Sequence, residues 1–458
     1  MSTNYLRTFV ITALCFAVLA LITPAAMADG PSAANADNAE YVLGLGRGSN
    51  GWMEFRDGTN GGYNHMAWRQ VPWSVYNGRN GETFPAAGYL DNDALAEYVI
   101  GLGETSNCWM QIRNDSGTGY AHIRWLQVPW PAYCTSNGQT HPSLGNIDGG
   151  NLDEMAIGLG TGANGWFEIR DDSGTNYAHK RWLQVPWSTY NSANGLTRPV
   201  LGDIDCDGLD EIVIGLGRKA NGWMQVRDDA NHGYAHLRWI QVPWSTYNGN
   251  NGETRPALGD LDNDGCDEIV IGLGPGANGW VQVRDDAAHG YAHLSWEKVN
   301  YAAYNANNGS TRPAVDSLQA GGEAEIVLGL GTGSNCWHQI RDGASTNYNF
   351  LAWRQAPWST YCSANGDTRP SAANLTPALA AMRAAVGEPA HISDGAVDGP
   401  MADANADMSG PQADMSVDMS GPQESKSTAA ELAPSAADAA IDAAPQETGE
   451  VFAGPEAQ

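Results

Sequence analysis

The sequence predicts an all-β fold, a six-bladed β-propeller, from three observations: a repeat, a composition and a strand pattern. The tripeptide Gly-Leu-Gly recurs six times at a constant spacing of 57 residues, from Gly44 to Gly329. The 458 residues include 55 Gly and 17 Trp, a composition typical of short strands joined by tight turns. Repeats of this length bury their faces against neighbouring repeats in a propeller.

Four short strands are expected in each repeat. In the fifth repeat they cover residues 255–261, 268–272, 280–284 and 293–299, each bounded by turn residues. The second segment is almost wholly apolar, as in a strand covered on both faces, whereas the third alternates apolar and polar residues. No helical period competes with this pattern.

The C-terminal end of the repeat region predicts closure of the ring. Thr368-Arg369-Pro370 repeats the first-strand motif Thr254-Arg255-Pro256 after the last complete repeat, and the first repeat lacks a good copy of it. We therefore expect the C-terminal strand to complete the first blade.

Two further segments flank the repeats. Residues 1–28 contain one cation, Arg7, an apolar run and the sequence Ala26-Met27-Ala28, which predict a signal peptide and an exported protein. The propeller is expected over 29–375, and no stretch there is apolar enough to span a membrane. Residues 376–458 contain 14 Asp+Glu and 2 Lys+Arg, a low-complexity acidic composition that predicts a disordered tail.

The formal net charge of -28 argues against nucleic-acid binding, which needs a basic surface. Two loops suggest a cation instead. The loop between the first and second strands reads Asp-x-Asp-x-Asp-Gly-x-Asp-Glu in repeats four and five, beginning at Asp203 and Asp260. This motif resembles the FG-GAP/VCBS repeat family, the calcium-binding blades of integrin α-subunit propellers, over roughly residues 37–375.

The resemblance implies that oxygen atoms at loop positions 1, 3, 5 and 9 hold Ca²⁺. The implied ligands are Asp203, Asp205, Asp207 and Glu211 in repeat four, and Asp260, Asp262, Asp264 and Glu268 in repeat five. Weaker versions of the loop keep Asn146, Asp148 and Glu154 in repeat three, and Asp91, Asp93 and Glu97 in repeat two. The Glu recurs in all six repeats, so it is also expected to have a structural hydrogen-bonding role.

Cysteine spacing predicts two disulfides. Cys108 and Cys336 occupy one repeat position, and Cys134 and Cys362 occupy another, so we expect the bonds Cys108–Cys134 and Cys336–Cys362. Cys206 and Cys266 lie at non-equivalent positions in the two acidic loops, and we expect them to be free thiols.

Recurrent aromatic and basic residues are candidates for a glycan-binding surface, with one pocket in each blade. The candidates are Trp109, Trp166, Trp223, Trp280, Arg113, Arg170, Arg227 and Arg284. Because these types recur in nearly every repeat, packing between blades is the favoured alternative. Residues that break the symmetry, such as His141 and His338, are scattered along the chain, so no enzyme is expected.

The family resemblance implies recognition or adhesion outside the cell. The sequence leaves open whether the partner is a glycan or an extracellular or surface protein. A structural scaffold is the alternative function, and an enzyme with a site in an axial pocket is the third. The oligomeric state also stays open.

Overall fold

The computed structural model describes residues 39–58, 62–93, 95–319 and 323–373. These residues belong to the second of the two units into which the chain divides, Asp37–Gln458. The predicted signal peptide, 1–28, and the predicted tail, 376–458, lie outside the described residues. The described residues form six four-stranded antiparallel sheets, which confirms the six-bladed β-propeller.

The blades are numbered here by the repeat that supplies most of their strands, and each is given from the inner to the outer strand. Blade one consists of β24 (Thr368–Ala373), β1 (Glu40–Leu45), β2 (Trp52–Arg56) and β3 (His65–Gln70). Blade two consists of β4 (Thr83–Gly88), β5 (Glu97–Leu102), β6 (Trp109–Arg113) and β7 (His122–Gln127). Blade three consists of β8 (Thr140–Gly145), β9 (Glu154–Leu159), β10 (Trp166–Arg170) and β11 (His179–Gln184).

Blade four consists of β12 (Thr197–Gly202), β13 (Glu211–Leu216), β14 (Trp223–Arg227) and β15 (His236–Gln241). Blade five consists of β16 (Thr254–Gly259), β17 (Glu268–Leu273), β18 (Trp280–Arg284) and β19 (His293–Lys298). Blade six consists of β20 (Thr311–Asp316), β21 (Glu325–Leu330), β22 (Trp337–Arg341) and β23 (Phe350–Gln355). The inner strand of blade five ends earlier than predicted, because the chain leaves the sheet at Asp260 to form the acidic loop.

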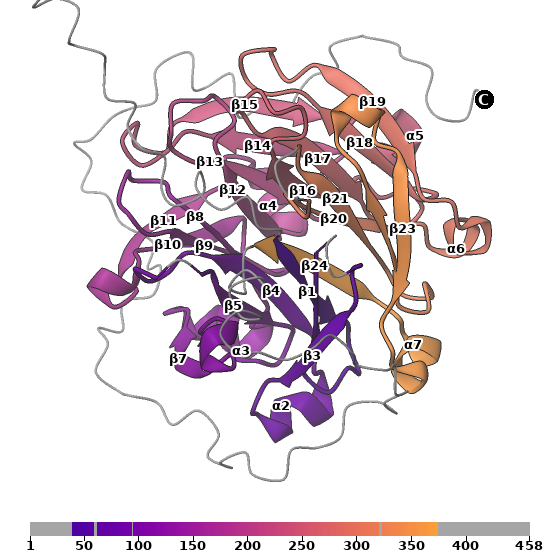
Figure 1. The fold of residues 1–458 in the computed structure, drawn as a ribbon. Coiled ribbons are helices and arrows are strands. Elements are labelled where there is room, and N and C mark those ends of the chain that lie inside the picture. The colour runs from indigo at the N-terminus through magenta and orange to yellow at the C-terminus, as the bar shows by residue number, and fades with distance from the viewer. Residues whose placement is uncertain (1–38, 59–61, 94, 320–322, 374–458) are drawn as a thin grey trace, which may run out of the picture. The chain divides into compact units, whose positions relative to one another are not determined.

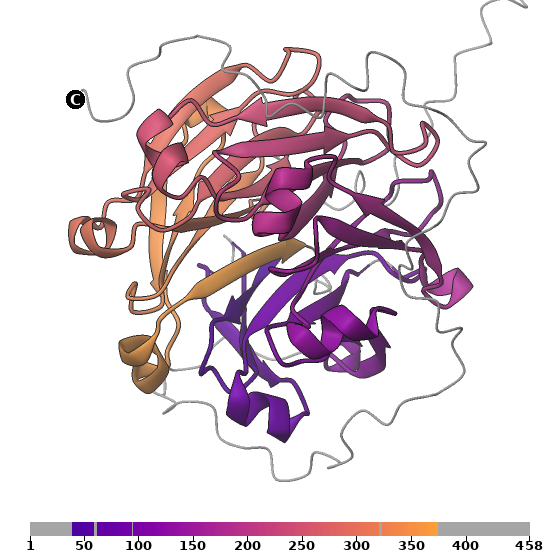
Figure 2. The same ribbon diagram turned by 180° about the vertical axis from the view of Figure 1, so that it is seen from behind.

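The ring closes as predicted, by pairing of β24 with β1. Tyr41 lies opposite Ala372 and Leu43 opposite Pro370 in this antiparallel pair. The inner strands β24, β4, β8, β12, β16 and β20 each contact the next around the ring, and Figures 1 and 2 show them from opposite sides. Each pair of neighbouring blades also shares a buried hydrophobic cluster. Blade-to-blade packing therefore forms the core.

The first glycine of each Gly-Leu-Gly lies where two blades approach closely. A Cβ atom on Gly215 would collide with Cδ of Pro256 on the next inner strand and lie 2.7 Å from the carbonyl oxygen of Thr254. The Gly-Leu-Gly motif of one blade thus packs against the Thr-x-Pro motif of the next blade. This contact explains why both motifs recur every 57 residues.

Short helices connect the outer strand of one blade to the inner strand of the next, and the sequence analysis missed them. They are α2 (Ser74–Arg79), α3 (Pro131–Ser136), α4 (Ser188–Ala193), α5 (Ser245–Asn250), α6 (Ala302–Asn307) and α7 (Ser359–Ala364). The described residues also form three single-turn 3-10 helices: η3 (Ser116–Thr118), η4 (Ser173–Thr175) and η5 (Ala344–Thr346). Helices of six residues are too short to show a 3.6-residue period.

A buried tyrosine fixes each of these connections. In α5, the Tyr247 hydroxyl donates to the carbonyl oxygen of Glu253 at 2.6 Å and accepts from the backbone N–H of Gly274 at 2.6 Å. Each inner strand thus starts after a helix and ends at the loop that is acidic in several blades. Since six residues of strand span about 20 Å, the helices and the acidic loops lie at opposite ends of the inner strands.

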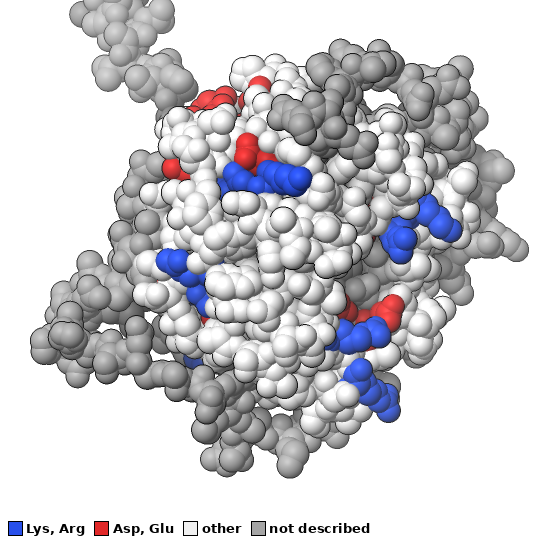
Figure 3. Space-filling view, turned by 90° about the vertical axis from the view of Figure 1, so that its right-hand side faces the viewer, with Lys and Arg blue, Asp and Glu red and all other residues white. Residues whose placement is uncertain are grey.

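Charged side chains are sparse on the side of the molecule shown in Figure 3. Lys and Arg occur there in small separate groups, several beside Asp or Glu, and they form no extended basic area. Among the described residues, no helix is both long enough and apolar enough to cross a membrane.

Candidate metal centre

The acidic loops of blades four and five have the turn geometry that the sequence predicts. Gly208 and Gly265, at loop position 6, have φ angles of 91° and 93°, a region that glycine enters without steric cost. Their N–H groups donate to Oδ2 of Asp203 at 3.0 Å and of Asp260 at 3.1 Å. The turn therefore gathers its carboxylates on one side, and single oxygen atoms of Asp203, Asp205 and Asp207 lie within 4.8 Å of one another.

The recurrent glutamate bonds to the backbone of each loop from its buried side. Glu211 and Glu268 are completely buried, and their Oε2 atoms accept from the backbone N–H of Ile204 at 3.0 Å and of Leu261 at 2.7 Å. This confirms the predicted structural role. Their Oε1 atoms, however, have no hydrogen-bond partner among the described residues. A buried carboxylate oxygen without a partner is costly, so each of these oxygens is a candidate ligand for a cation.

Blade three shows where such a group lies. Lys180 in β11 brings its Nζ within 2.5 Å of Asp148 Oδ2, 2.9 Å of Asp171 Oδ1 and 4.0 Å of Glu154 Oε1. The ammonium group thus occupies the centre of the degenerate loop. Blades four and five have Leu237 and Leu294 at the position of Lys180. The exposed His232 and His289 lie beside these loops instead, each with one nitrogen within 4.8 Å of oxygen atoms of Asp207 or Asp264.

Blade six fills the same place with an amide. Gln319 occupies loop position 3, and its Nε2 donates to Glu325 Oε1 at 2.5 Å and to Asp342 Oδ1 at 3.4 Å. The glutamate oxygen that lacks a partner in blades four and five is therefore satisfied where the loop aspartates have been lost. The ammonium group of Lys180 and the amide group of Gln319 thus lie at the same place in their blades, between the recurrent glutamate and the Asp that follows the third strand.

Blade two resembles blades four and five in this respect. Oxygen atoms of Asp91, Asp93 and Glu97 lie within 4.8 Å of one another, and Glu97 Oε1 has no partner among the described residues. The corresponding loop of blade one precedes Ala39 and lies outside them.

Each site gains one further candidate ligand, which lies outside the loop motif. Asp171, which contacts Lys180, and Asp342, which contacts Gln319, occupy the same repeat position as Asp228 and Asp285. These two residues follow β14 and β18, at the same end of the blade as the acidic loop, and each lies near position 3 of that loop. Recurrence of Asp at this position, with Asn114 the exception, was the signal in the sequence.

Burial and neighbouring carboxylates determine the charge of the buried glutamates. Burial and the negative charges of Asp205, Asp203 and Asp207 raise the pKa of Glu211 to about 9, although the hydrogen bond from Ile204 lowers it. Burial likewise raises the pKa of Glu268 to about 9. Without a cation these carboxyl groups take up a proton at neutral pH, so metal binding would release protons.

The role of Lys180 as a counter-charge can be tested by replacing it with the leucine that blade four has at this position. Lys180→Leu is expected to lower the free energy of unfolding by about 2 kcal/mol in chelator, because Asp148, Glu154 and Asp171 lose their counter-charge. Added calcium should restore part of this loss. Chemical denaturation with and without calcium measures both effects, and Lys219→Leu, on an exposed loop, is the control. A variant as stable as the parent chain in chelator would contradict the role given to Lys180.

The structure contains three disulfides among the described residues. Cys108–Cys134 and Cys336–Cys362 each join residues 26 apart, as predicted. The prediction that Cys206 and Cys266 are free thiols is wrong, because they are bonded to each other. Residues at the same repeat position in two neighbouring blades are separated by the width of a blade. The two adjacent loops therefore meet through residues at different repeat positions. This bond ties the acidic loop of blade four to that of blade five.

The recurrent arginines at the ends of the third strands join neighbouring blades. Arg227 donates from Nη1 to the carbonyl oxygen of Tyr234 at 3.0 Å and from Nη2 to that of Gln184, in blade three, at 2.8 Å. Arg113, Arg170 and Arg284 make the same pair of bonds. The tyrosine also lies under an arginine of the preceding blade, as Tyr234 does under Arg181.

The candidate tryptophans contact other tryptophans. Trp166 meets Trp182 edge to face with ring centroids 6.4 Å apart, and Trp182 meets Trp130 of blade two at 5.9 Å. Trp109, Trp223 and Trp280 are arranged in the same way. This geometry supports packing between blades, and glycan binding by these residues stays a prediction.

Arg227→Met is expected to lower the free energy of unfolding by about 2 kcal/mol, because two hydrogen bonds from a charged group are lost. Chemical denaturation measures the change, with Arg218→Met on an exposed loop as the control. An unchanged stability would return Arg227 to the list of candidate ligand-binding residues.

No model of a known protein family matches the chain, and no curated protein matches it either. Similar solved structures include the Dos1 propeller, with 13% identity, coverage of 69% of this chain and 67% of that chain, and a TM-score of 0.37. Apo AztD from Citrobacter koseri has 9% identity, coverage of 74% and 100%, and a TM-score of 0.36. A putative 6-phosphogluconolactonase from Bacteroides fragilis has 9% identity, coverage of 69% and 82%, and a TM-score of 0.41. Likenesses at this level assign neither a family nor a function to the chain.

Proposed function

We propose that this chain is an exported, calcium-stabilised propeller that binds an extracellular ligand and does not transform it. The observation that carries the calcium assignment is the buried glutamate oxygen of blades four and five. It has no hydrogen-bond partner where the loop has three aspartates, whereas an amide satisfies it in blade six. In blade three it also lacks a hydrogen bond, but a lysine ammonium lies 4.0 Å from it. The aspartates and the glutamate of each loop offer oxygen ligands, which favour Ca²⁺ over softer metals, and His232 and His289 each place one nitrogen within 4.8 Å of oxygen atoms of Asp207 or Asp264.

Two features support a role outside the cytoplasm. Three disulfides are typical of proteins that fold in an oxidising compartment. One of them joins the two calcium loops, so both sites would form as one rigid unit. The resemblance to FG-GAP/VCBS repeats agrees with this role.

Recognition fits the geometry better than catalysis. The residues that break the repeat symmetry lie apart: His141 lines the axis, Glu297 pairs with Arg341 at 2.6 Å, and the buried His338 contacts the Tyr41 hydroxyl at 3.0 Å. Among the described residues, these groups form no nucleophile and base pair. A structural scaffold is the second candidate, favoured by the use of the recurrent arginines and tryptophans between blades.

The recognition role can be tested on an array that carries glycans and extracellular proteins. The array is probed with the full-length chain, once with calcium and once with chelator. Binding to a defined partner in calcium supports recognition and identifies its class. Folded protein that binds nothing in either condition would favour the scaffold.

A further inference from the structure

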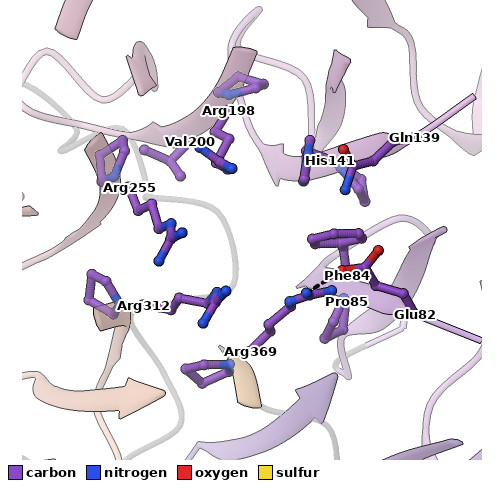
Figure 4. A pocket seen from close by; sticks show the side chains of 15 residues that line it. Glu82, Phe84, Pro85, Gln139, His141, Arg198, Val200, Arg255, Arg312 and Arg369 are labelled. Atoms are coloured by element: carbon purple, nitrogen blue, oxygen red, sulfur yellow. Dashed lines mark hydrogen bonds and ion pairs between the residues drawn. The ribbon is translucent and has the colours of Figure 1, made fainter. Parts of the chain in front are cut away.

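A cavity of about 330 Å³ lies on the axis of the propeller, at the helix end of the inner strands. All six inner strands line it, each with the residue at its second position. These residues are Phe84, His141, Arg198, Arg255, Arg312 and Arg369. Figure 4 shows the four arginines reaching into this axial pocket from consecutive strands, with Phe84 and His141 on the remaining side.

The axial pocket has more positive than negative charges. Glu253 pairs with Arg198 at 2.8 Å and with Arg255 at 3.0 Å. Asp367 pairs with Arg312 at 2.6 Å and with Arg369 at 2.8 Å. Arg369 also pairs with Glu82. Four guanidinium groups face three carboxylates, which leaves a net charge of one positive unit.

The remaining side of the axial pocket is neutral. Burial lowers the pKa of His141 well below its usual value, and the surrounding arginines lower it further. The His141 ring lies edge to face with Phe84, with centroids 4.3 Å apart. This side therefore suits an uncharged part of a ligand.

Packing alone does not explain the four arginines. Phe84 and His141 occupy the same strand position in blades two and three, so the ring closes without a cation there. Arg198 Nη1 and His141 Nε2 have no hydrogen-bond partner among the described residues. Clustering is also unfavourable, because burial, Arg255 and Arg369 lower the pKa of Arg312 to about 10 in spite of Asp367. A bound anion would use the free donor and reduce this repulsion.

We propose that the axial pocket binds a monoanionic saccharide residue, with its carboxylate on the guanidinium groups around Arg198 and its ring toward Phe84 and His141. The single excess charge matches one carboxylate, which arginine binds in a bidentate geometry. The cavity has the size of a small-molecule site. This inference deepens the proposed recognition function and rests on it for the choice of a saccharide.

Calorimetric titration of the full-length chain with a matched pair of sugars tests the proposal. Methyl glucuronide and methyl glucoside differ only in the carboxylate. The glucuronide should bind at least tenfold more tightly than the glucoside. Equal affinities would overturn the proposal, and so would inorganic sulfate that binds as tightly as the glucuronide, because the site would then hold a bare oxyanion.

Arg198→Gln should weaken glucuronide binding at least tenfold, while Glu253 keeps its pairing with Arg255. Arg79→Gln, which removes an exposed arginine of α2, is the control and should bind as the parent chain does. Val200→Phe fills the axial pocket without removing a charge and should also abolish binding. Glucuronide binding that survives both pocket variants would overturn the proposal. If Arg198→Gln does not fold, Val200→Phe decides alone.

The outcome can be separated from that of the calcium assignment. The axial pocket and the calcium loops lie at opposite ends of the inner strands, so chelator should leave glucuronide binding unchanged below the melting temperature. If the glucuronide does not bind but chelator still lowers the melting temperature, only the ligand assignment would be wrong.

Discussion

Removal of calcium is expected to lower the melting temperature of the propeller by about 10 °C. A ligand present at 100 times its dissociation constant stabilises a protein by about 2.7 kcal/mol per site, and two sites would contribute about 5 kcal/mol. In large domains each kcal/mol changes the melting temperature by about 2 °C. Calorimetry of the full-length chain with calcium and with chelator measures the effect.

The double variant Asp205→Ala with Asp262→Ala should remove most of this dependence, because each change deletes the position 3 ligand of one site. Glu104→Ala, which removes an exposed carboxylate paired with Arg47, serves as the control and should keep the full calcium effect. If chelator does not change the melting temperature of the parent chain, the calcium assignment is wrong.

Loss of the disulfide between the two loops should have the second large effect. It joins residues 60 apart in sequence, and the chain-entropy account gives such a bond about 4 kcal/mol of stability. The double variant Cys206→Ser with Cys266→Ser should lose about this amount. Its calcium affinity should also fall roughly tenfold, because the loops must then be ordered on binding.

The matched control is Cys108→Ser with Cys134→Ser, which opens a loop of 26 residues away from the calcium loops. It should lose about 3.5 kcal/mol of stability and keep its calcium affinity. Calcium titration and chemical denaturation of both variants separate the two effects. Equal calcium affinity in the two double variants would show that the Cys206–Cys266 bond does not organise the sites.

Much of the fold could be predicted because the chain repeats one unit six times. The constant spacing of Gly-Leu-Gly predicted the blades, and the displaced Thr368-Arg369-Pro370 motif predicted their closure. The connecting helices were missed because six residues carry no measurable period. Their signal was the buried tyrosine, such as Tyr247, which recurs in every repeat.

The candidate metal centre could be predicted only in part. The order of residues within a loop predicted the candidate ligands of blades four and five, because those residues are close in sequence. Asp228, Asp285 and the Cys206–Cys266 bond depend on contacts between separate loops, which a motif within one loop does not contain. The arginine lining of the axial pocket was missed because it too depends on contacts between separate repeats. Four of the six inner strands have an Arg at their second position, and each looks like a packing residue until the ring brings the four together.

In blades four and five, a cation is expected at the position that Lys180 holds in blade three and Gln319 holds in blade six. A crystal structure grown with calcium, with anomalous scattering data, tests this expectation directly. One metal is expected within about 2.3–2.6 Å of Oε1 of Glu211 and another at the same distance from Oε1 of Glu268, with none in blades three and six. Metal absent from blades four and five, or metal bound in blade three beside Lys180, would contradict it.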